Sequence, residues 1–290
     1  RTPLRLAADN ACPAAVKVLL DAGAAVDATD RNENAALHWL AHHGAADVIE
    51  LALAHKAALE SVNLAGETPL LRAISRGHLG CVKLLVDEGA SVTCRDSSGV
   101  TALQLAVKYG AQGGDAATAC EMLELLLRNK VDVTATDAEK RTALHFACVD
   151  DALQRGVESL LAAGASADTA DWAGHTPLHW ACFFDACAVT KALLGKGASP
   201  AATDRHQRTP LHRAAERDSA RCLELLVHTP AVNVDAIDVD GFAALHYAAR
   251  AGATSCVKLL LDGGADRHFE SVGGASPADL TTTPEIHELL

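Results

Sequence analysis

Apolar residues lie in short segments that return in the same order about every 33 residues along the chain. Each period opens with a tetrapeptide such as Thr-Pro-Leu-His, continues through an alanine-rich segment, and then carries a leucine pair such as Leu84-Leu85. The tetrapeptide or a close variant starts at Thr2, Ala35, Thr68, Thr101, Thr142, Thr176, Thr209, Ala243 and Ser276. Because a unit of this size cannot bury its apolar side alone, the fixed period predicts one supersecondary unit that is copied and stacked.

The residue types within one period predict two short helices. The hydroxyl of Thr176 can cap the N–H groups that open a first helix, and Pro177 suits the first helical position because its missing N–H costs nothing there. The segment with the leucine pair predicts a second helix, which ends at a glycine such as Gly89 that accepts a left-handed conformation. An extended stretch and a turn then lead to the next period.

The turn before each tetrapeptide carries an aspartate or asparagine five residues ahead of the threonine position. These residues are Asp30, Asn63, Asp96, Asp137, Asp171, Asp204 and Asp238. A glycine completes the turn at Gly66, Gly99, Gly174 and Gly241. Glu33, Lys140 and Gln207 take the place of this glycine in three turns, and we expect those tips to be slightly strained or differently shaped.

The tetrapeptide, the spacing and the glycine helix ends resemble the ankyrin repeat, and the resemblance covers the whole chain. It implies an all-α solenoid of helix-turn-helix units with β-hairpin-like turns, about nine repeats in a single domain over residues 1–290, the first and last incomplete. We expect the repeats at 1–29, 30–62, 63–95, 96–136, 137–170, 171–203, 204–237, 238–270 and 271–290. An insertion around 110–119 separates the two helices of the fourth repeat and predicts a flexible loop or a helix extension, which we interpret as tolerated rather than as a second binding loop.

Charge and cysteine content narrow the function classes. The net charge of −12 disfavours a general nucleic-acid binder, because phosphate neutralisation needs clustered Lys and Arg. The chain contains no apolar run of about 18 residues, so the sequence predicts no transmembrane helix. Nine cysteines, an odd number in small apolar positions, indicate a reducing compartment. We therefore expect a cytoplasmic protein, with the nucleus or the cytoplasmic face of a membrane as alternatives. The start at Arg1, inside a repeat, indicates a piece of a longer protein.

Histidine is the residue type that most suggests a metal site, since the chain has 14. Five of them occupy the fourth tetrapeptide position, where the resemblance implies local hydrogen bonds that hold hairpin to helix: His38, His145, His179, His212 and His246. His38 and His42 are four residues apart, a spacing that can hold zinc, but no nearby cysteine or carboxylate completes a ligand set. No phosphate-binding loop or catalytic motif is present. The sequence predicts no metal site, no cofactor and no catalysis.

The resemblance implies that partners bind on a concave face made of hairpin tips and first helices. Exposed aromatic residues and arginines at the variable positions of this face are the residue types that dominate interface energies. Such residues gather in repeats five to eight, where the basic seventh repeat follows an aromatic cluster. The candidate partner-binding residues are Tyr109, Arg141, Trp172, His175, Phe183, Phe184, Arg205, His206, Arg208, Glu216, Arg217 and Phe242.

Two structural interpretations compete with this binding role. In the first, the rings pack on each other and merely cover the first helices; we favour it for Trp39 and Trp180 but not for the cluster of Trp172, Phe183 and Phe184. In the second, the arginines form a solvated surface network with nearby acids, in which Arg213 and Arg221 pair with Glu216, Asp218 and Glu224.

The sequence therefore predicts a non-catalytic interaction module or scaffold. Its partner is expected to be a peptide or protein with hydrophobic anchors and an acidic or phosphorylated flank, not a nucleic acid, and without direct membrane insertion. The alternative is a substrate- or partner-recruiting arm of a larger enzyme or membrane-associated protein. A minor alternative is a methyl-lysine reader, with walls from Trp172, Trp180, Phe183 and Phe184 and an acidic floor from Asp185 or Glu216.

Overall fold

The computed structural model describes residues 2–10 and 12–290, and its regular structure is helical. In place of strands, the described residues hold isolated β-bridges, Arg95 with Thr101 and Ile237 with Ala243. The predicted all-α class is therefore confirmed. Contacts divide the chain into a first unit, Arg1–Ala138, and a second unit, Glu139–Leu290.

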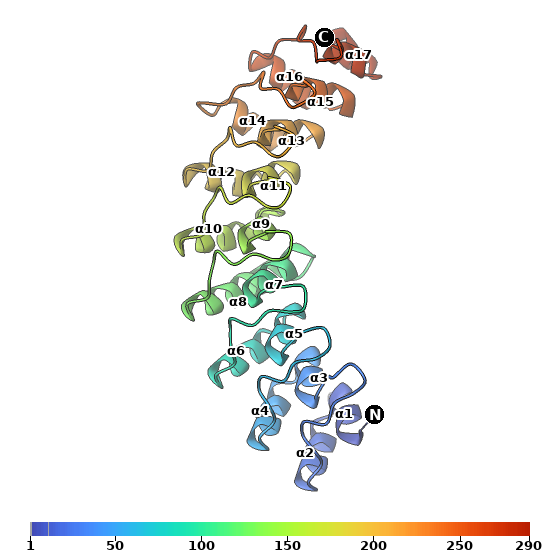
Figure 1. Ribbon diagram of the computed structural model, residues 1–290, viewed down its shortest axis with the longest axis vertical. Helices are drawn as coiled ribbons and strands as arrows, with labels where there is room; N and C mark the ends of the chain where they lie inside the picture. The colour runs from blue at the N-terminus through green and yellow to red at the C-terminus, as the bar shows by residue number, and fades with distance from the viewer. Residues whose placement is uncertain (1, 11) are drawn as a thin grey trace. The chain divides into compact units, whose positions relative to one another are not determined.

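The first unit contains four helix pairs arranged in two rows (Figure 1). The helices are α1 (Pro3–Asp9), α2 (Pro13–Asp21), α3 (Ala36–His43), α4 (Ala46–Ala54), α5 (Pro69–Ser75), α6 (Leu79–Asp87), α7 (Ala102–Ala111) and α8 (Ala116–Arg128). The first helix of each repeat packs against the first helix of the next, and the second helices form the other row.

The second unit repeats this two-row arrangement. Its helices are α9 (Ala143–Ala147), the 3-10 helix η1 (Asp151–Leu153), α10 (Gln154–Ala162), α11 (Pro177–Phe183), α12 (Cys187–Gly195), α13 (Pro210–Glu216), α14 (Ala220–Val227), α15 (Ala244–Ala251), α16 (Thr254–Asp262), α17 (Pro277–Leu280) and α18 (Pro284–Leu289). The helices α9, α11, α13, α15 and α17 form the row of first helices. Fully buried leucine and alanine side chains such as Leu178, Ala181 and Leu193 fill the space between the rows, because small residues let thin helical layers approach closely.

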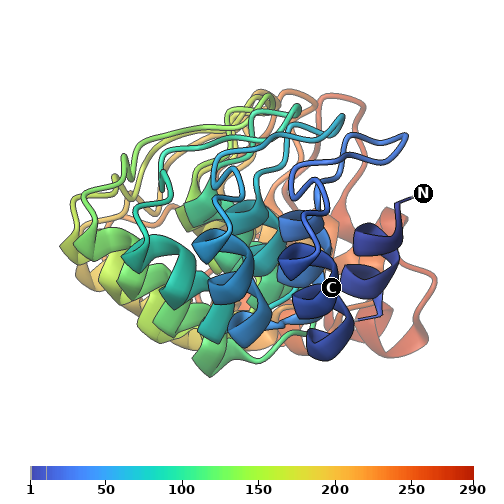
Figure 2. The same ribbon diagram turned by 90° about the horizontal axis from the view of Figure 1, so that it is seen from below.

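Hairpins project along one side of the helices in each unit (Figure 2). The turn aspartate fixes each hairpin tip: in the sixth repeat, Asp171 Oδ1 accepts the backbone N–H groups of Ala173 and His175, both at 2.9 Å. Neighbouring tips are joined by backbone hydrogen bonds, such as Arg205 N–H to the Ala173 carbonyl at 3.1 Å. A Cβ at Gly174 would lie 2.8 Å from the backbone nitrogen of Arg205, so glycine is required at this close approach.

The histidine at the fourth tetrapeptide position connects two successive repeats, as predicted. In the sixth repeat, Nδ1 of His179 accepts the Thr176 N–H at 3.1 Å, and the N–H at Nε2 donates to the Arg208 carbonyl of the next repeat at 3.0 Å. His38 makes the same pair of bonds, with Ala35 and Glu67. Because both ring nitrogens of His38 are used in this way, they are not free to form the zinc pair with His42.

Helix capping by threonine is confirmed in only some repeats. Thr68 and Thr101 accept the N–H three residues on, at 3.3 and 3.2 Å. The predicted cap at Thr176 is wrong: the hydroxyl of Thr176 instead lies 2.9 Å from Nδ1 of His179. The reason is that the histidine ring brings its lone pair to the same place, so the hydroxyl donates to the ring.

The insertion in the fourth repeat extends both helices. The first helix reaches Ala111 and the second starts at Ala116. Asp115 caps the N-terminus of this second helix, since its Oδ2 accepts the Thr118 N–H at 2.8 Å. Of the two expected alternatives, the helix extension is therefore observed, with a short connection between the helices.

The three turns without glycine have the expected left-handed backbone. The φ angles of Glu33, Lys140 and Gln207 are 61°, 60° and 61°. Residues with a Cβ pay a steric cost in this region, so the prediction of strained tips is confirmed.

Candidate functional site

A small aromatic pocket lies between α11 and α13 in the second unit. It has a volume of about 190 Å³ and is lined by His175, His179, Trp180, Phe183, Phe184 and Arg213. All six residues come from the hairpin and first helix of the sixth repeat or from the first helix of the seventh. The pocket therefore opens on the surface that the repeats build from hairpin tips and first helices.

The aromatic wall is formed by three rings near the end of α11. Phe183 and Phe184 make an edge-to-face contact with centroids 5.1 Å apart, and Trp180 lies 6.1 Å from Phe184. Phe184 remains 46% exposed although it is a large apolar residue. An exposed ring beside an apolar pocket is a typical marker of a binding surface.

Trp180 contributes to the pocket as well as to the packing. Its ring makes an edge-to-face contact with Phe146 at 6.3 Å, and its indole N–H donates to Asp171 Oδ2 at 3.1 Å. Trp180 therefore packs against its neighbours, as the sequence interpretation held, and it also lines the pocket.

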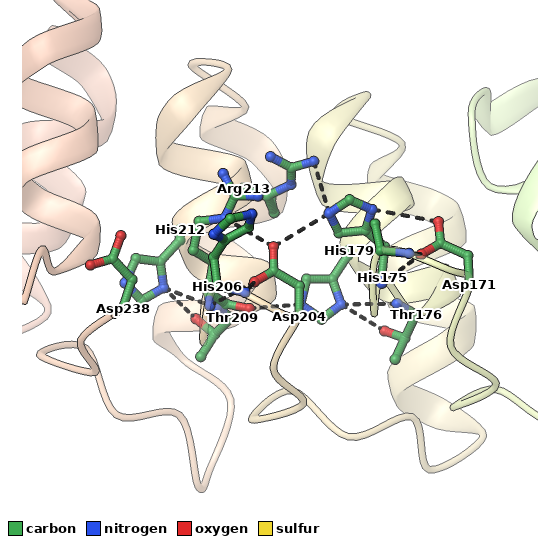
Figure 3. Close-up of polar contacts among 12 residues, drawn as sticks. Asp171, His175, Thr176, His179, Asp204, His206, Thr209, His212, Arg213 and Asp238 are labelled. Carbon is green, nitrogen blue, oxygen red and sulfur yellow. Dashed lines mark hydrogen bonds and ion pairs between the residues drawn. The ribbon is translucent and has the colours of Figure 1, made fainter. Parts of the chain in front are cut away.

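The polar wall of the pocket is centred on His175 (Figure 3). Its Nδ1 lies 3.5 Å from Asp171 Oδ2, and its Nε2 lies 3.3 Å from Asp204 Oδ2. The Nη2 group of Arg213 lies 3.1 Å from the same Nε2 atom. Asp171, Asp204 and Arg213 thus place two anions and one cation around one imidazole ring.

Asp204 is an ionised carboxylate in this cluster. Burial raises its pKa, but the contact with His175 and the backbone hydrogen bond and charge of Arg208 outweigh burial. The pKa of Asp204 is therefore held well below its usual range. Arg208 Nε donates to Asp204 Oδ2 at 2.9 Å, which fixes the carboxylate at the base of the hairpin.

Arginine guanidinium groups lie over the aromatic rings of this surface. The guanidinium carbon of Arg205 is 4.2 Å from the centroid of Trp172, which is 60% exposed. The corresponding carbons of Arg213 and Arg217 lie 4.9 and 4.6 Å from Phe183. Such stacking holds a cation near an aromatic face and leaves its N–H edge free to bind an anion.

The surface network predicted for the arginines is correct in one pair and wrong in another. Arg213 Nη1 donates to Glu216 Oε2 at 2.7 Å, as expected. Arg221 pairs with Asp151 at 3.0 Å and not with Asp218 or Glu224. The helix α13 ends at Glu216, and the left-handed φ of 57° at Asp218 turns the chain, so Arg221 points to the row of second helices.

The remaining candidate residues lie outside the pocket lining. Phe242 contacts His246 and Tyr247, with centroids at 5.4 and 6.4 Å, and His206 is exposed on a hairpin tip. Arg141 pairs with Glu139 at 3.0 Å and lies 4.8 Å from the Phe146 ring.

Tyr109 belongs to the first unit, where its ring packs over glycine. A Cβ on Gly77 would lie 2.1 Å from this ring. Tyr109 is therefore not among the residues that line the pocket.

Three residues of the pocket lining are outside the predicted partner-binding set: His179, Trp180 and Arg213. Arg213 was assigned to the basic seventh repeat and to a surface network, although it and Arg217, which follows the last residue of α13, both lie over Phe183 of the aromatic cluster. Trp180 follows the conserved-looking tetrapeptide directly and was assigned to packing. In both cases the signal was the position beside Phe183, three residues after Trp180 on the same helix.

Among residues 2–10 and 12–290, no group of three or more His, Cys, Asp or Glu side chains is arranged to hold a metal ion. None of the helices found there combines the length and the apolar character that crossing a bilayer requires.

Comparison with known proteins identifies the family. The model for ankyrin repeats (three copies) matches residues 4–96, 37–115, 111–204 and 187–269. The nuclear factor NF-kappa-B p105 subunit of Gallus gallus is 34% identical over 151 residues, covering 51% of this chain and 15% of that protein. The transient receptor potential cation channel subfamily A member 1 homolog of Caenorhabditis elegans is 31% identical over 160 residues, covering 55% of this chain and 12% of that protein. The chain thus spans only a small part of either relative, and because the family matches run through most of its length, it belongs to the ankyrin-repeat family.

Proposed function

We propose that this chain is a non-catalytic interaction module that binds a peptide or protein partner on the second unit. Ankyrin repeats generally serve as protein–protein interaction modules, and family membership supports this class. The observation that carries the location is the aromatic pocket between α11 and α13, with the exposed rings of Trp172 and Phe184 on the same repeat. We call the surface made by Trp172, Phe183, Phe184, Arg205, Arg213 and Arg217 the aromatic–arginine surface.

The proposed partner presents an apolar side chain with an acidic or phosphorylated flank. The pocket is of a size to accept one large apolar side chain, which would contact Trp180, Phe183 and Phe184. Among the described residues, Arg205 and Arg217 have no carboxylate partner, so their guanidinium groups are available for an anion. Burial of an aromatic anchor and pairing with arginine are the interactions that carry most of the binding energy at interfaces.

The methyl-lysine alternative is less well supported. An aromatic cage needs open ring faces, whereas Arg213 and Arg217 already lie over Phe183. The acids named for the floor are also engaged, because Glu216 pairs with Arg213 and Asp185 Oδ1 accepts the Cys222 N–H at 3.1 Å.

The interaction module is proposed to act within a longer protein, either as a scaffold or as a recruiting arm of an enzyme or a membrane-associated protein. The short coverage of both relatives supports this view. We propose a cytoplasmic location, with the nucleus and the cytoplasmic face of a membrane as alternatives suggested by a nuclear factor and a channel homolog among the relatives.

The test is selection of a displayed random-peptide library on the whole chain, repeated with Trp172→Ala/Phe184→Ala. Peptides that contain a large apolar residue should be enriched on the unmodified chain, and their affinity should fall at least about thirtyfold on the double variant, which loses two anchor contacts. Thermal unfolding should change little, because Trp172 and Phe184 are exposed.

The matched control is Val272→Ala, since Val272 is an 84% exposed apolar residue on a different hairpin. This variant should bind the selected peptides normally. Equal loss with both variants, or peptides that bind the double variant unchanged, would place the binding surface elsewhere.

A further inference from the structure

The imidazole of His175 has more partners than its protons and lone pairs can serve at one time. Its Nε2 lies 3.1 Å from Arg213 Nη2, which can only donate, and 3.3 Å from Asp204 Oδ2, which accepts as an ionised carboxylate. A ring nitrogen either carries a proton and donates, or offers a lone pair and accepts. Nε2 can therefore satisfy Arg213 or Asp204, but not both.

These two possibilities are two protonation states. In neutral His175, Nε2 accepts from Arg213 and the proton at Nδ1 faces Asp171 at 3.5 Å. In protonated His175, both N–H groups face carboxylates, and Arg213 loses its acceptor and faces a cation. Asp204 keeps its hydrogen bond from Arg208 Nε at 2.9 Å in either state.

The charges around His175 come from three elements. The hairpins before α11 and α13 supply Asp171, Asp204 and Arg208, and α13 supplies Arg213 and Glu216. His179 on α11, with its ring centroid at 5.9 Å, is held neutral because both of its ring nitrogens are bonded to backbone groups. Three carboxylates and two guanidinium groups sum to −1 with neutral His175, and to zero when His175 is protonated.

Arg213 is the group that connects His175 to the pocket. The guanidinium edge formed by Nε–H and Nη2–H fits a carboxylate side-on. Among the described residues, Arg213 Nε is buried without a hydrogen-bond partner, and Nη2 is the atom that His175 occupies. Nη1 stays with Glu216 at 2.7 Å. Protonation of His175 therefore leaves Nε and Nη2 of Arg213, a side chain that lines the pocket, both without an acceptor, and repulsion by the new cation favours turning this edge toward the pocket.

We propose that the pocket binds an apolar side chain next to a carboxylate, and that binding draws a proton onto His175. This inference rests on the proposed function and adds its ligand chemistry and its proton linkage. The carboxylate takes the Nε–Nη2 edge of Arg213, while protonated His175 bridges Asp171 and Asp204. A single negative charge is favoured over a phosphate dianion, because the pocket wall already holds the carboxylates of Asp171, Asp204 and Glu216.

The probe is a short peptide with one phenylalanine followed by glutamate in an otherwise glycine–serine sequence, compared with the same peptide carrying glutamine or phosphoserine in place of glutamate. Affinity of the glutamate peptide should rise about tenfold as pH falls from about 8 to about 5.5, where histidine gains its proton. Calorimetry of the unmodified chain in two buffers of different ionisation enthalpy should show net proton uptake on binding near pH 7, about half a proton per peptide for a tenfold linkage.

The variant His175→Gln should bind with no pH dependence and without proton uptake. Its matched control is His206→Gln, because His206 is exposed and its ring makes no hydrogen bond or ion pair among the described residues; this variant should keep the pH dependence. Circular dichroism at each pH checks that the fold is intact.

The outcomes separate the two proposals. Binding of the glutamate peptide that is indifferent to pH, or releases protons, overturns this inference and leaves the proposed function standing. Tighter binding of the phosphoserine peptide overturns the carboxylate assignment. Failure of every peptide, selected or designed, to bind the aromatic–arginine surface defeats the proposed function and this inference with it.

Discussion

The two units use the same repeat frame but hold their hairpins with different residues. In the second unit, each of four successive first helices carries a histidine at the fourth tetrapeptide position: His145, His179, His212 and His246. In the first unit, the repeats with a complete hairpin carry His38, Leu71 and Gln104 at this position, so only one of the three has a histidine. Gln104 copies the geometry of histidine, since its Oε1 accepts the Thr101 N–H at 2.8 Å and its Nε2 donates to the Ala135 carbonyl at 3.4 Å.

A glutamine in this role has no proton to gain, whereas a histidine does. Burial lowers the pKa of His179 to about 4, although its hydrogen bond to the Arg208 carbonyl opposes the shift. Burial also lowers the pKa values of His38, His212 and His246. At this tetrapeptide position the two units therefore differ in acid sensitivity.

The largest expected effect is acid destabilisation at the histidine positions. Unfolded histidine binds a proton below about pH 6.5 while folded His179 stays neutral down to about pH 4, so the unfolded state is favoured as pH falls through this window and stability is complete above it. His179 alone should contribute a loss of roughly 3 kcal/mol between these limits. Urea unfolding at pH 7 and pH 4.5 should show a smaller acid loss for His179→Gln and a larger one for Gln104→His.

The lowered pKa of Asp204 acts in a separate window. Its contribution is present above the unfolded pKa of aspartate and is lost as pH falls below that value. Hydrogen exchange should show α11 and α13 opening at higher pH than α5 and α7, because burial lowers the pKa values of His179 and His212, whereas α5 and α7 carry Leu71 and Gln104 at this position. If His179→Gln and Gln104→His lose the same free energy of unfolding between pH 7 and pH 4.5, the tetrapeptide histidines do not determine the acid stability.

The second comparison concerns the last residues of the first helices. α3 ends with His42-His43, and Arg76 Nε donates to His42 Nδ1 at 3.2 Å, whereas α11 ends with Phe183 and is followed by Phe184. At the corresponding place in the first unit, Trp39 stacks on His43 with ring centroids 6.4 Å apart and lies 5.9 Å from His42. The end of the first helix thus carries two histidine rings in α3, and two phenylalanine rings beside the pocket at α11.

Exchanging these residues should remove binding from the second unit. Phe183→His/Phe184→His should weaken the selected peptides about thirtyfold or more, because two anchor rings are lost, while the urea midpoint changes little since neither ring is fully buried. Fluorescence anisotropy of a labelled peptide measures the loss. If the variant kept its affinity, Trp172 and Trp180 would be sufficient to bind the selected peptides without the two phenylalanine rings.

The reach of sequence reasoning follows from the same positions. The period, the aspartate turn and the role of the tetrapeptide histidine depend on local spacing, and the structure confirms each of them. The pocket depends on how residues 29 to 38 positions apart meet, such as Arg213 with His175. A periodic sequence places both on one surface but does not give rotamers, so Arg213 was predicted as a paired surface residue and its second contact was missed.

A smaller effect distinguishes the two equivalent tryptophans. The indole N–H of Trp180 donates to Asp171 at 3.1 Å, whereas the buried indole N–H of Trp39 faces the equivalent carboxylate of Asp30 without reaching full hydrogen-bonding geometry. Trp180→Phe should therefore cost about 1 kcal/mol of unfolding free energy more than Trp39→Phe, the usual net value of one hydrogen bond. Urea unfolding of the two variants at pH 7 measures this difference, and equal costs would contradict the assignment.

The smallest expected effect comes from the exposed arginines. Arg205 and Arg217 lie on Trp172 and Phe183 with free N–H edges, so Arg205→Gln/Arg217→Gln should weaken an acidic peptide only a few-fold, because exposed ion pairs contribute about 1 kcal/mol or less. The same change should flatten the dependence of affinity on salt, since screening acts on exposed charges. Arg31→Gln, an exposed hairpin arginine of the first unit, is the control and should leave both quantities unchanged. A salt dependence that survives the double change but disappears with Arg31→Gln would move the anion-binding surface from the second unit to the first.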